Sequence, residues 1–203
     1  MKAQYIFFGM LIALLFVLPG CDKDPEIIIQ KETVTVHDTL IVLDTVTLIE
    51  TVFQTIPDTA TTFILVRHAE TSGGGSNPVL SAAGQARAQE LNQVLSRLNL
   101  AAVYSTDFSR TKQTVQSTAT AHALSVITYD PFSPDALLTQ TLNTFPKGIV
   151  LIVGHSNTIP ALLNLMVGAN TFPDLEESEY DNLFVAQVSS KGDATVIHMK
   201  YGD

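Results

Sequence analysis

The chain of 203 residues contains a single cysteine, Cys21, and few basic side chains. One cysteine excludes both an intrachain disulfide and a zinc site built from several cysteines. Eleven lysine and arginine residues stand against twenty acidic residues, which gives a net charge of −9. No basic stripe is available to neutralise the phosphates of a nucleic acid, so we expect no nucleic-acid partner.

The chain also lacks an N-terminal apolar run long enough to cross a membrane. Residues 5–18 form a run of fourteen, and a helix of that length rises only about 21 Å against a hydrocarbon core of about 30 Å. This length is typical of the apolar part of a signal peptide. We therefore expect residues 1–20 to be an export signal.

Residues 18–21 resemble the lipobox of bacterial lipoproteins, although Pro19 stands where a small or apolar residue is usual. The resemblance implies that cleavage leaves Cys21 at the N-terminus and that its thiol carries a lipid. The protein would then be anchored to a membrane at the cell envelope, outside the cytoplasm, on the periplasmic side or at the cell surface. The alternative is an ordinary secretory signal followed by an incidental cysteine.

Residues 21–61 are acidic and rich in threonine and valine. An acid–threonine–apolar triplet recurs every six residues, beginning at Glu32, Asp38, Asp44 and Glu50. Six is a multiple of the strand period of two and not of 3.6, so the repeat favours extended structure. We interpret this segment as a stalk or linker; a self-associating β segment is the alternative.

Residues 62–203 alternate between strand and helix patterns. We expect strands at 62–69, 101–105, 124–128, 148–155, 182–188 and 195–199, and helices at 81–98, 106–121, 133–142 and 158–167. This order predicts one layered α/β domain with a largely parallel sheet.

Two serines are expected to cap helices. Ser81 would begin the first helix, whose apolar positions are Ala83, Ala86, Leu91, Val94, Leu95 and Leu98. Ser133 would cap the third helix, with Pro134 at its first position and the acidic Asp135 near its positive end.

Arg67 and His68 directly follow a strand pattern that is apolar throughout, and His155 follows a second one. The carboxyl ends of parallel strands are where ligands bind in open α/β sheets. Arg110 would lie in the first turn of a helix, where the helix dipole does not favour a cation and a bound anion would. Chance placement of the histidines, and a surface arginine paired with Asp107, are the alternatives.

Together, residues 65–71, 105–114 and 153–156 resemble the motifs of the histidine phosphatase superfamily, also called phosphoglycerate-mutase-like, in order and on the expected element types. The resemblance covers roughly residues 62–203, and the size is similar to the compact bacterial branch. It implies a three-layer α/β/α, Rossmann-like fold.

The resemblance also implies roles for four residues. His68 would be the nucleophile that forms a phosphohistidine, while Arg67, Arg110 and His155 would bind the phosphoryl oxygens. A protonated His155 would add positive charge in the transition state. This arrangement requires no metal or other cofactor.

The superfamily commonly has a glutamate as general acid between the second arginine and the second histidine, and only Asp130 and Asp135 are acidic within residues 111–154. Asp130 ends a strand and is the first candidate acid; Asp135 is the second. If neither acts, substrates whose leaving groups need little protonation, such as phosphohistidine, are favoured.

The sequence therefore predicts a phosphatase that acts on a small phosphorylated substrate or a phosphoprotein, hydrolysing a phosphomonoester or a phosphohistidine. A catalytically silent interaction protein on the same fold at the cell envelope is the alternative. A serine hydrolase built on residues 154–158 is disfavoured, because Thr158 replaces the final glycine of the required Gly-x-Ser-x-Gly motif.

Overall fold

A computed structural model describes residues 34–36, 39–41 and 60–202. The predicted signal peptide, Cys21 and most of the predicted stalk lie outside the described residues. The part of the stalk that is described forms two short antiparallel strands, β1 (Val34–Val36) and β2 (Thr39–Ile41). None of the helices in the described part of the chain is long and apolar enough to cross a membrane.

The domain is built on a six-stranded sheet in the order β10-β9-β3-β8-β6-β7. Its strands are β3 (Thr61–Arg67), β6 (Leu100–Ser105), β7 (Val126–Thr128), β8 (Ile149–Gly154), β9 (Asn182–Ser190) and β10 (Asp193–Lys200). Neighbours among β3, β8, β6 and β7 are parallel, whereas β9 runs antiparallel to both β3 and β10. The prediction of a mostly parallel sheet is confirmed.

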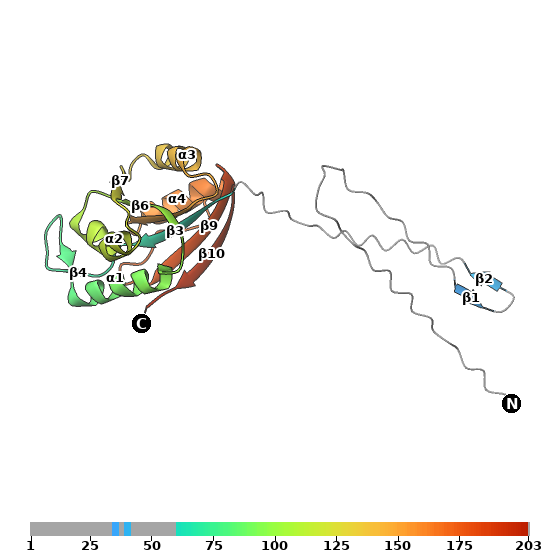
Figure 1. Cartoon of the computed structure of the whole chain (residues 1–203), viewed down its shortest axis with the longest axis horizontal. Coiled ribbons are helices and arrows are strands. Elements are labelled where there is room, and N and C mark those ends of the chain that lie inside the picture. The colour runs from blue at the N-terminus through green and yellow to red at the C-terminus, as the bar shows by residue number, and fades with distance from the viewer. Residues whose placement is uncertain (1–33, 37–38, 42–59, 203) are drawn as a thin grey trace, which may run out of the picture. The chain divides into compact units, whose positions relative to one another are not determined.

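Helices cover both faces of this sheet (Figure 1). Helices α1 (Ala82–Leu95) and α2 (Ser109–Ala121) lie on one face, and α3 (Pro134–Thr144) and α4 (Thr158–Val167) lie on the other. Side chains of β3 alternate between the two cores: Phe63 and Leu65 pack toward α3 and α4, while Ile64 and Val66 pack toward α1 and α2. Burial on both faces explains why β3 is apolar throughout. The three-layer α/β/α fold is confirmed.

A small ribbon interrupts the connection from β3 to α1. Strands β4 (Thr71–Ser72) and β5 (Val79–Leu80) pair antiparallel across the glycine-rich loop. This connection begins at the predicted nucleophile, so its path helps to set the position of His68.

Ser81 caps α1 as predicted, because its hydroxyl oxygen accepts a hydrogen bond from the Gly84 amide at 3.1 Å. The predicted buried face of α1 is partly wrong. Val94 is 53% exposed and Leu98 is 36% exposed. Ala83 and Ala86 are exposed as well, whereas Leu91 and Leu95 are buried as predicted. The other buried positions of α1 are Gly84 and Ala88. The small residues on this stripe allow the first turns of α1 to lie close to the β3–α1 loop.

The side-chain cap predicted for α3 is also wrong. Ser133 occupies the cap position but makes no side-chain hydrogen bond to the helix. Its hydroxyl donates to Asp130 Oδ2 at 2.9 Å instead. Pro134 and Asp135 do lie in the first turn of α3, as expected.

Replacing Gly84 with alanine should destabilise the domain. A Cβ atom at this position would lie 2.1 Å from the backbone oxygen of Glu70, which a rigid loop cannot accommodate without moving. We expect the free energy of unfolding to fall by about 1–3 kcal/mol, the usual range for overpacking. Urea denaturation measures the change.

Gly74→Ala is the matched control, because a Cβ at Gly74 would have no atom within 4 Å. It should leave the denaturation midpoint nearly unchanged. Equal midpoints for the two variants would contradict the proposed close contact between α1 and Glu70.

Candidate active site

The parallel pairing of β3 with β8 brings the two predicted histidines together. The register places Arg67 opposite Gly154, and the His68 amide donates to the Gly154 carbonyl at 3.0 Å. His68 and His155 each follow the end of a strand, and their ring centroids are 5.5 Å apart. The structure therefore joins at one sheet edge two residues that are distant in sequence.

Arg110 extends toward the same edge from the first turn of α2. Its Nη2 atom lies 3.3 Å from His155 Nδ1, and its guanidinium lies 4.4 Å from the centre of the Phe108 ring. Asp107 pairs with Lys112 instead. The alternative that Arg110 is a surface arginine paired with Asp107 is thus wrong.

The backbone fixes which nitrogen of His68 is free to react. His68 Nδ1 lies 2.8 Å from the carbonyl oxygen of Ala69. A carbonyl only accepts hydrogen bonds, so Nδ1 carries the proton and Nε2 holds the lone pair. The Ala69 amide, in turn, donates to Thr114 Oγ1 at 2.9 Å, which holds this peptide in place. His68 is therefore oriented as a nucleophile through Nε2.

His155 is oriented in the opposite sense. Arginine only donates, so His155 Nδ1 accepts from Arg110, and Nε2 carries the proton. Nε2 donates to Thr106 Oγ1 at 2.9 Å. Thr106 and Thr111 are linked through their hydroxyls, also at 2.9 Å, and Thr111 donates onward to the Phe108 carbonyl. Both threonines lie within the motif of residues 105–114, but the sequence analysis assigned them no role, because only tertiary contacts link them to His155.

Both histidines are neutral at pH 7. Burial, followed by the positive charges of Arg67 and Arg110, lowers the pKa of His68 from 6.5 to about 4, although its bond to Ala69 acts in the opposite direction. Burial and the charge of Arg110 likewise lower the pKa of His155 to about 4. A neutral His68 suits nucleophilic attack. The protonated His155 expected from the sequence is not the resting form.

Arg67 is almost completely buried, and one end of its guanidinium is already occupied. Nη1 lies 2.8–3.2 Å from the carbonyl oxygens of Glu176, Glu177 and Glu179. The guanidinium carbon also lies 4.3 Å from the centre of the Tyr180 ring. Nε has no hydrogen-bond partner, and Nη2 contacts the carboxylate of Glu177 at 3.0 Å. The Nε–Nη2 edge is therefore the part of Arg67 available to an anion.

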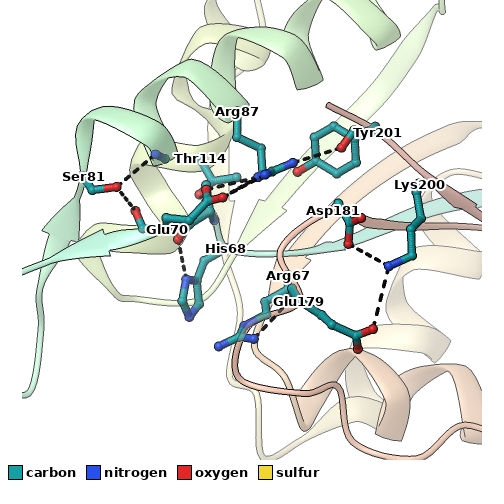
Figure 2. Close-up of polar contacts among 12 residues, drawn as sticks. Arg67, His68, Glu70, Ser81, Arg87, Thr114, Glu179, Asp181, Lys200 and Tyr201 are labelled. Carbon is teal, nitrogen blue, oxygen red and sulfur yellow. Dashed lines mark hydrogen bonds and ion pairs between the residues drawn. The ribbon is translucent and has the colours of Figure 1, made fainter. Parts of the chain in front are cut away.

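A partly buried ion pair supports the loop that follows His68 (Figure 2). Glu70 accepts hydrogen bonds from Arg87 Nε at 2.9 and 3.1 Å, and Arg87 Nη1 donates to the Tyr201 carbonyl at 3.0 Å. Partial burial would raise the pKa of Glu70, but the hydrogen bonds and charge of Arg87, the backbone amide of Glu70 and the charge of Arg67 together lower that pKa. No spacing pattern in the sequence links these three residues.

The side chains of Arg67, His68, Arg110 and His155 line an open pocket of about 460 Å³. Its lining comprises Arg67, His68, Thr71, Gly75, Ser76, Pro78, Phe108, Arg110, Pro131, Phe132, His155, Ser156, Asn157, Thr158, Glu177 and Tyr180. Among the described residues that line it, Glu177 is the one carboxylate. Clusters of three or more His, Cys, Asp or Glu residues that could hold a metal do not occur in the described part of the chain.

The structure does not bring either predicted acid into this pocket. Asp130 is exposed, and its carboxylate accepts from the Phe132 amide at 3.0 Å and from the Ser133 hydroxyl at 2.9 Å. Asp135 forms an ion pair of 2.7 Å with Lys191. The contacts of both aspartates are explained by local structure.

The lowered pKa values of the two histidines predict how stability depends on pH. Between about pH 4 and 6.5 the unfolded chain binds protons at His68 and His155 that the folded protein does not bind. The free energy of unfolding should therefore fall as the pH is lowered from 6.5 toward 4. Urea denaturation across this range, with NMR titration of the imidazole carbons, measures the effect.

The double variant His68→Asn, His155→Asn is the control, because it removes both titrating groups. It should lose much of this pH dependence. Titration of both rings near 6.5 in the folded wild type would contradict the burial described above.

Comparison with known proteins agrees with this geometry. Residues 63–133, which contain Arg67, His68 and Arg110, match the family model described as histidine phosphatase superfamily (branch 1). A search of curated protein sequences found no match.

Solved structures resemble the whole domain. The protein histidine phosphatase SixA in complex with tungstate is 17% identical, covers 68% of this chain and 96% of its own, and has a TM-score of 0.54. A mycobacterial glucosyl-3-phosphoglycerate phosphatase is 16% identical, covers 63% of this chain and 90% of its own, and also has a TM-score of 0.54. The domain has the fold of the phosphoglycerate-mutase-like histidine phosphatases, and residues 63–133 carry the sequence pattern of that superfamily.

Proposed function

We propose that this protein is a phosphatase that hydrolyses a phosphomonoester or a phosphohistidine through a phosphohistidine intermediate on His68. One observation carries the proposal: His68 donates from Nδ1 to the Ala69 carbonyl, so the lone pair of Nε2 is free beside two guanidinium groups. Phosphoryl transfer needs an in-line nucleophile and positive charge around the phosphoryl oxygens. The site supplies both.

In the first step, His68 Nε2 attacks phosphorus and the bond from phosphorus to the leaving group breaks. Arg67, through its Nε–Nη2 edge, and Arg110 stabilise the negative charge on the phosphoryl oxygens. The carboxylate of Glu177 moves away from Arg67 Nη2 when the phosphoryl group takes its place. The exposed side chain of Glu177 leaves it free to do so.

In the second step, water attacks phosphorus, the bond from phosphorus to Nε2 breaks, and inorganic phosphate leaves. The hydrogen bond from Nδ1 to Ala69 stabilises the positive charge on the His68 ring while it is phosphorylated. A bound phosphoryl dianion also favours protonation of His155, whose Nδ1 faces Arg110 in the resting protein. His155 therefore gains its positive charge with the substrate.

The position of the aspartates favours one kind of substrate. Neither Asp130 nor Asp135 lines the pocket. Leaving groups that need little protonation fit this site best. The same observation favours the second candidate, a catalytically silent interaction protein on this fold.

Hydrolysis of p-nitrophenyl phosphate and of phosphohistidine peptides by the purified full chain tests the proposal. His68→Ala should lower kcat by at least about 10³-fold, as expected for loss of a nucleophile. Arg110→Gln should lower kcat/KM by about 10²–10³-fold, because it removes one charge from the transition state. Wild type given ³²P-labelled substrate and quenched with alkali should carry acid-labile label, and His68→Ala should carry none.

Arg97→Gln is the matched control for Arg110→Gln, because Arg97 is exposed and does not line the pocket. It should retain full activity. Inert wild type and inert His68→Ala across a panel of phosphate compounds would instead establish the silent interaction protein.

We also propose that Cys21 carries a lipid that anchors the protein at the cell envelope. The supporting observation is the lipobox-like sequence that ends at the only cysteine of the chain. Cells grown with radioactive palmitate should label the wild-type protein and not the Cys21→Ser variant. Equal absence of label from both proteins would refute the lipid anchor.

A further inference from the structure

The wall of the pocket beyond the arginines is aromatic. Phe132 lines the pocket and is 88% exposed, more than any of the other exposed large apolar side chains in the described part of the chain. Phe108 and Tyr180 line the pocket too, but each ring is already covered by an arginine: Arg110 lies 4.4 Å from the centre of the Phe108 ring and Arg67 lies 4.3 Å from the centre of the Tyr180 ring. Phe132 is therefore the ring whose surface is open to a ligand.

The turn that carries Phe132 is rigid. The Asp130 carboxylate accepts hydrogen bonds from the Phe132 amide and the Ser133 hydroxyl. The backbone carbonyl of Asp130 accepts a further one from the Ser133 amide at 3.1 Å. Pro131 and Pro134 flank Phe132 and Ser133 and restrict the backbone further. The backbone that carries the phenyl ring is therefore preorganised, which reduces the entropy lost when a ligand packs against the ring.

The charges of the lining offer no place for a second anionic group. Arg67 and Arg110 are the cationic side chains among the described residues that line the pocket, and both are committed to the phosphoryl group. The carboxylate of Glu177 would repel a further negative charge. The remaining polar side chains at the pocket, such as Ser76 and Asn157, are neutral.

We propose that the site selects a phosphoryl group carried on a neutral aromatic ring, which packs against Phe132. This inference rests on the proposed function and names its substrate class. When His68 Nε2 attacks phosphorus, the phenol oxygen or the imidazole nitrogen keeps the electron pair of the broken bond and takes a proton from water. Phenols and imidazoles leave more readily than alkyl alcohols, which agrees with a pocket that neither Asp130 nor Asp135 lines. A phenolic ester and a phosphoimidazole share this chemistry.

Binding of phosphonates to the full chain tests the ring without requiring turnover. Phenylphosphonate and methylphosphonate have the same anionic head and differ only in the ring. Calorimetry should show that Phe132→Ala weakens phenylphosphonate binding by about 3–10-fold, the range of an aromatic contact, and leaves methylphosphonate binding unchanged. Ile197→Ala removes another exposed apolar side chain, which is 58% exposed and lies on β10 outside the pocket lining, and should change neither.

Equal affinities of wild type and Phe132→Ala for phenylphosphonate, or equal losses for both phosphonates, would overturn the inference even if the enzyme is active. Failure of the proposed function looks different. The protein would then bind phenylphosphonate in a Phe132-dependent way and hydrolyse nothing. Such a result would leave a binding site without catalysis and overturn the substrate assignment as well. With an active enzyme, kcat/KM for phenyl phosphate and for phosphoimidazole identifies the source. The substrate whose kcat/KM falls in Phe132→Ala contains the ring that the site selects.

Discussion

The register of the parallel pairing between β3 and β8 is the constraint on which the site depends. It sets Arg67 opposite Gly154, so that His68 and His155 both follow at the same edge of the sheet. A slip of one residue would turn each side chain of β3 to the other face and separate the two histidines. Burial of both faces of β3 opposes such a slip, because the two cores on either side take alternate residues of the strand. The packing of β3 between the two cores therefore determines which side chains meet at the edge of the sheet.

Much of this arrangement could be predicted from the sequence. Apolar runs that end in histidine, and an arginine after the following strand, were sufficient to predict the layered fold and to bring Arg67, His68, Arg110 and His155 to one edge. The face of α1 was harder, because Gly84 and Ala88 contribute little to an apolar pattern although they are buried. Neither could periodicity reveal that His155 is neutral, since its pKa is lowered by burial in the fold and by charges contributed by α2 and β3.

Polar contacts between distant segments were beyond the sequence for the same reason. Asp130 looked like a candidate acid because it follows a strand, yet its carboxylate organises the turn that carries Phe132. Glu177 lies beyond all three motif segments in the sequence and still reaches Arg67. The position of each carboxylate depends on the residues that it contacts in the fold. Counting the acidic residues within 111–154 therefore did not reveal which carboxylate reaches the site.

The contacts that hold Arg67 and the loop after His68 have a consequence for the order in which the site is completed during synthesis. Arg67 receives its carbonyl partners from residues 109 to 112 positions later, and Arg87 reaches 114 positions ahead to Tyr201. The strand that carries the chemistry is among the first parts of the domain to be synthesised, and its supports are among the last. A nascent chain therefore contains Arg67 and His68 before their supporting contacts exist, and these contacts are complete only when the final strands have been synthesised.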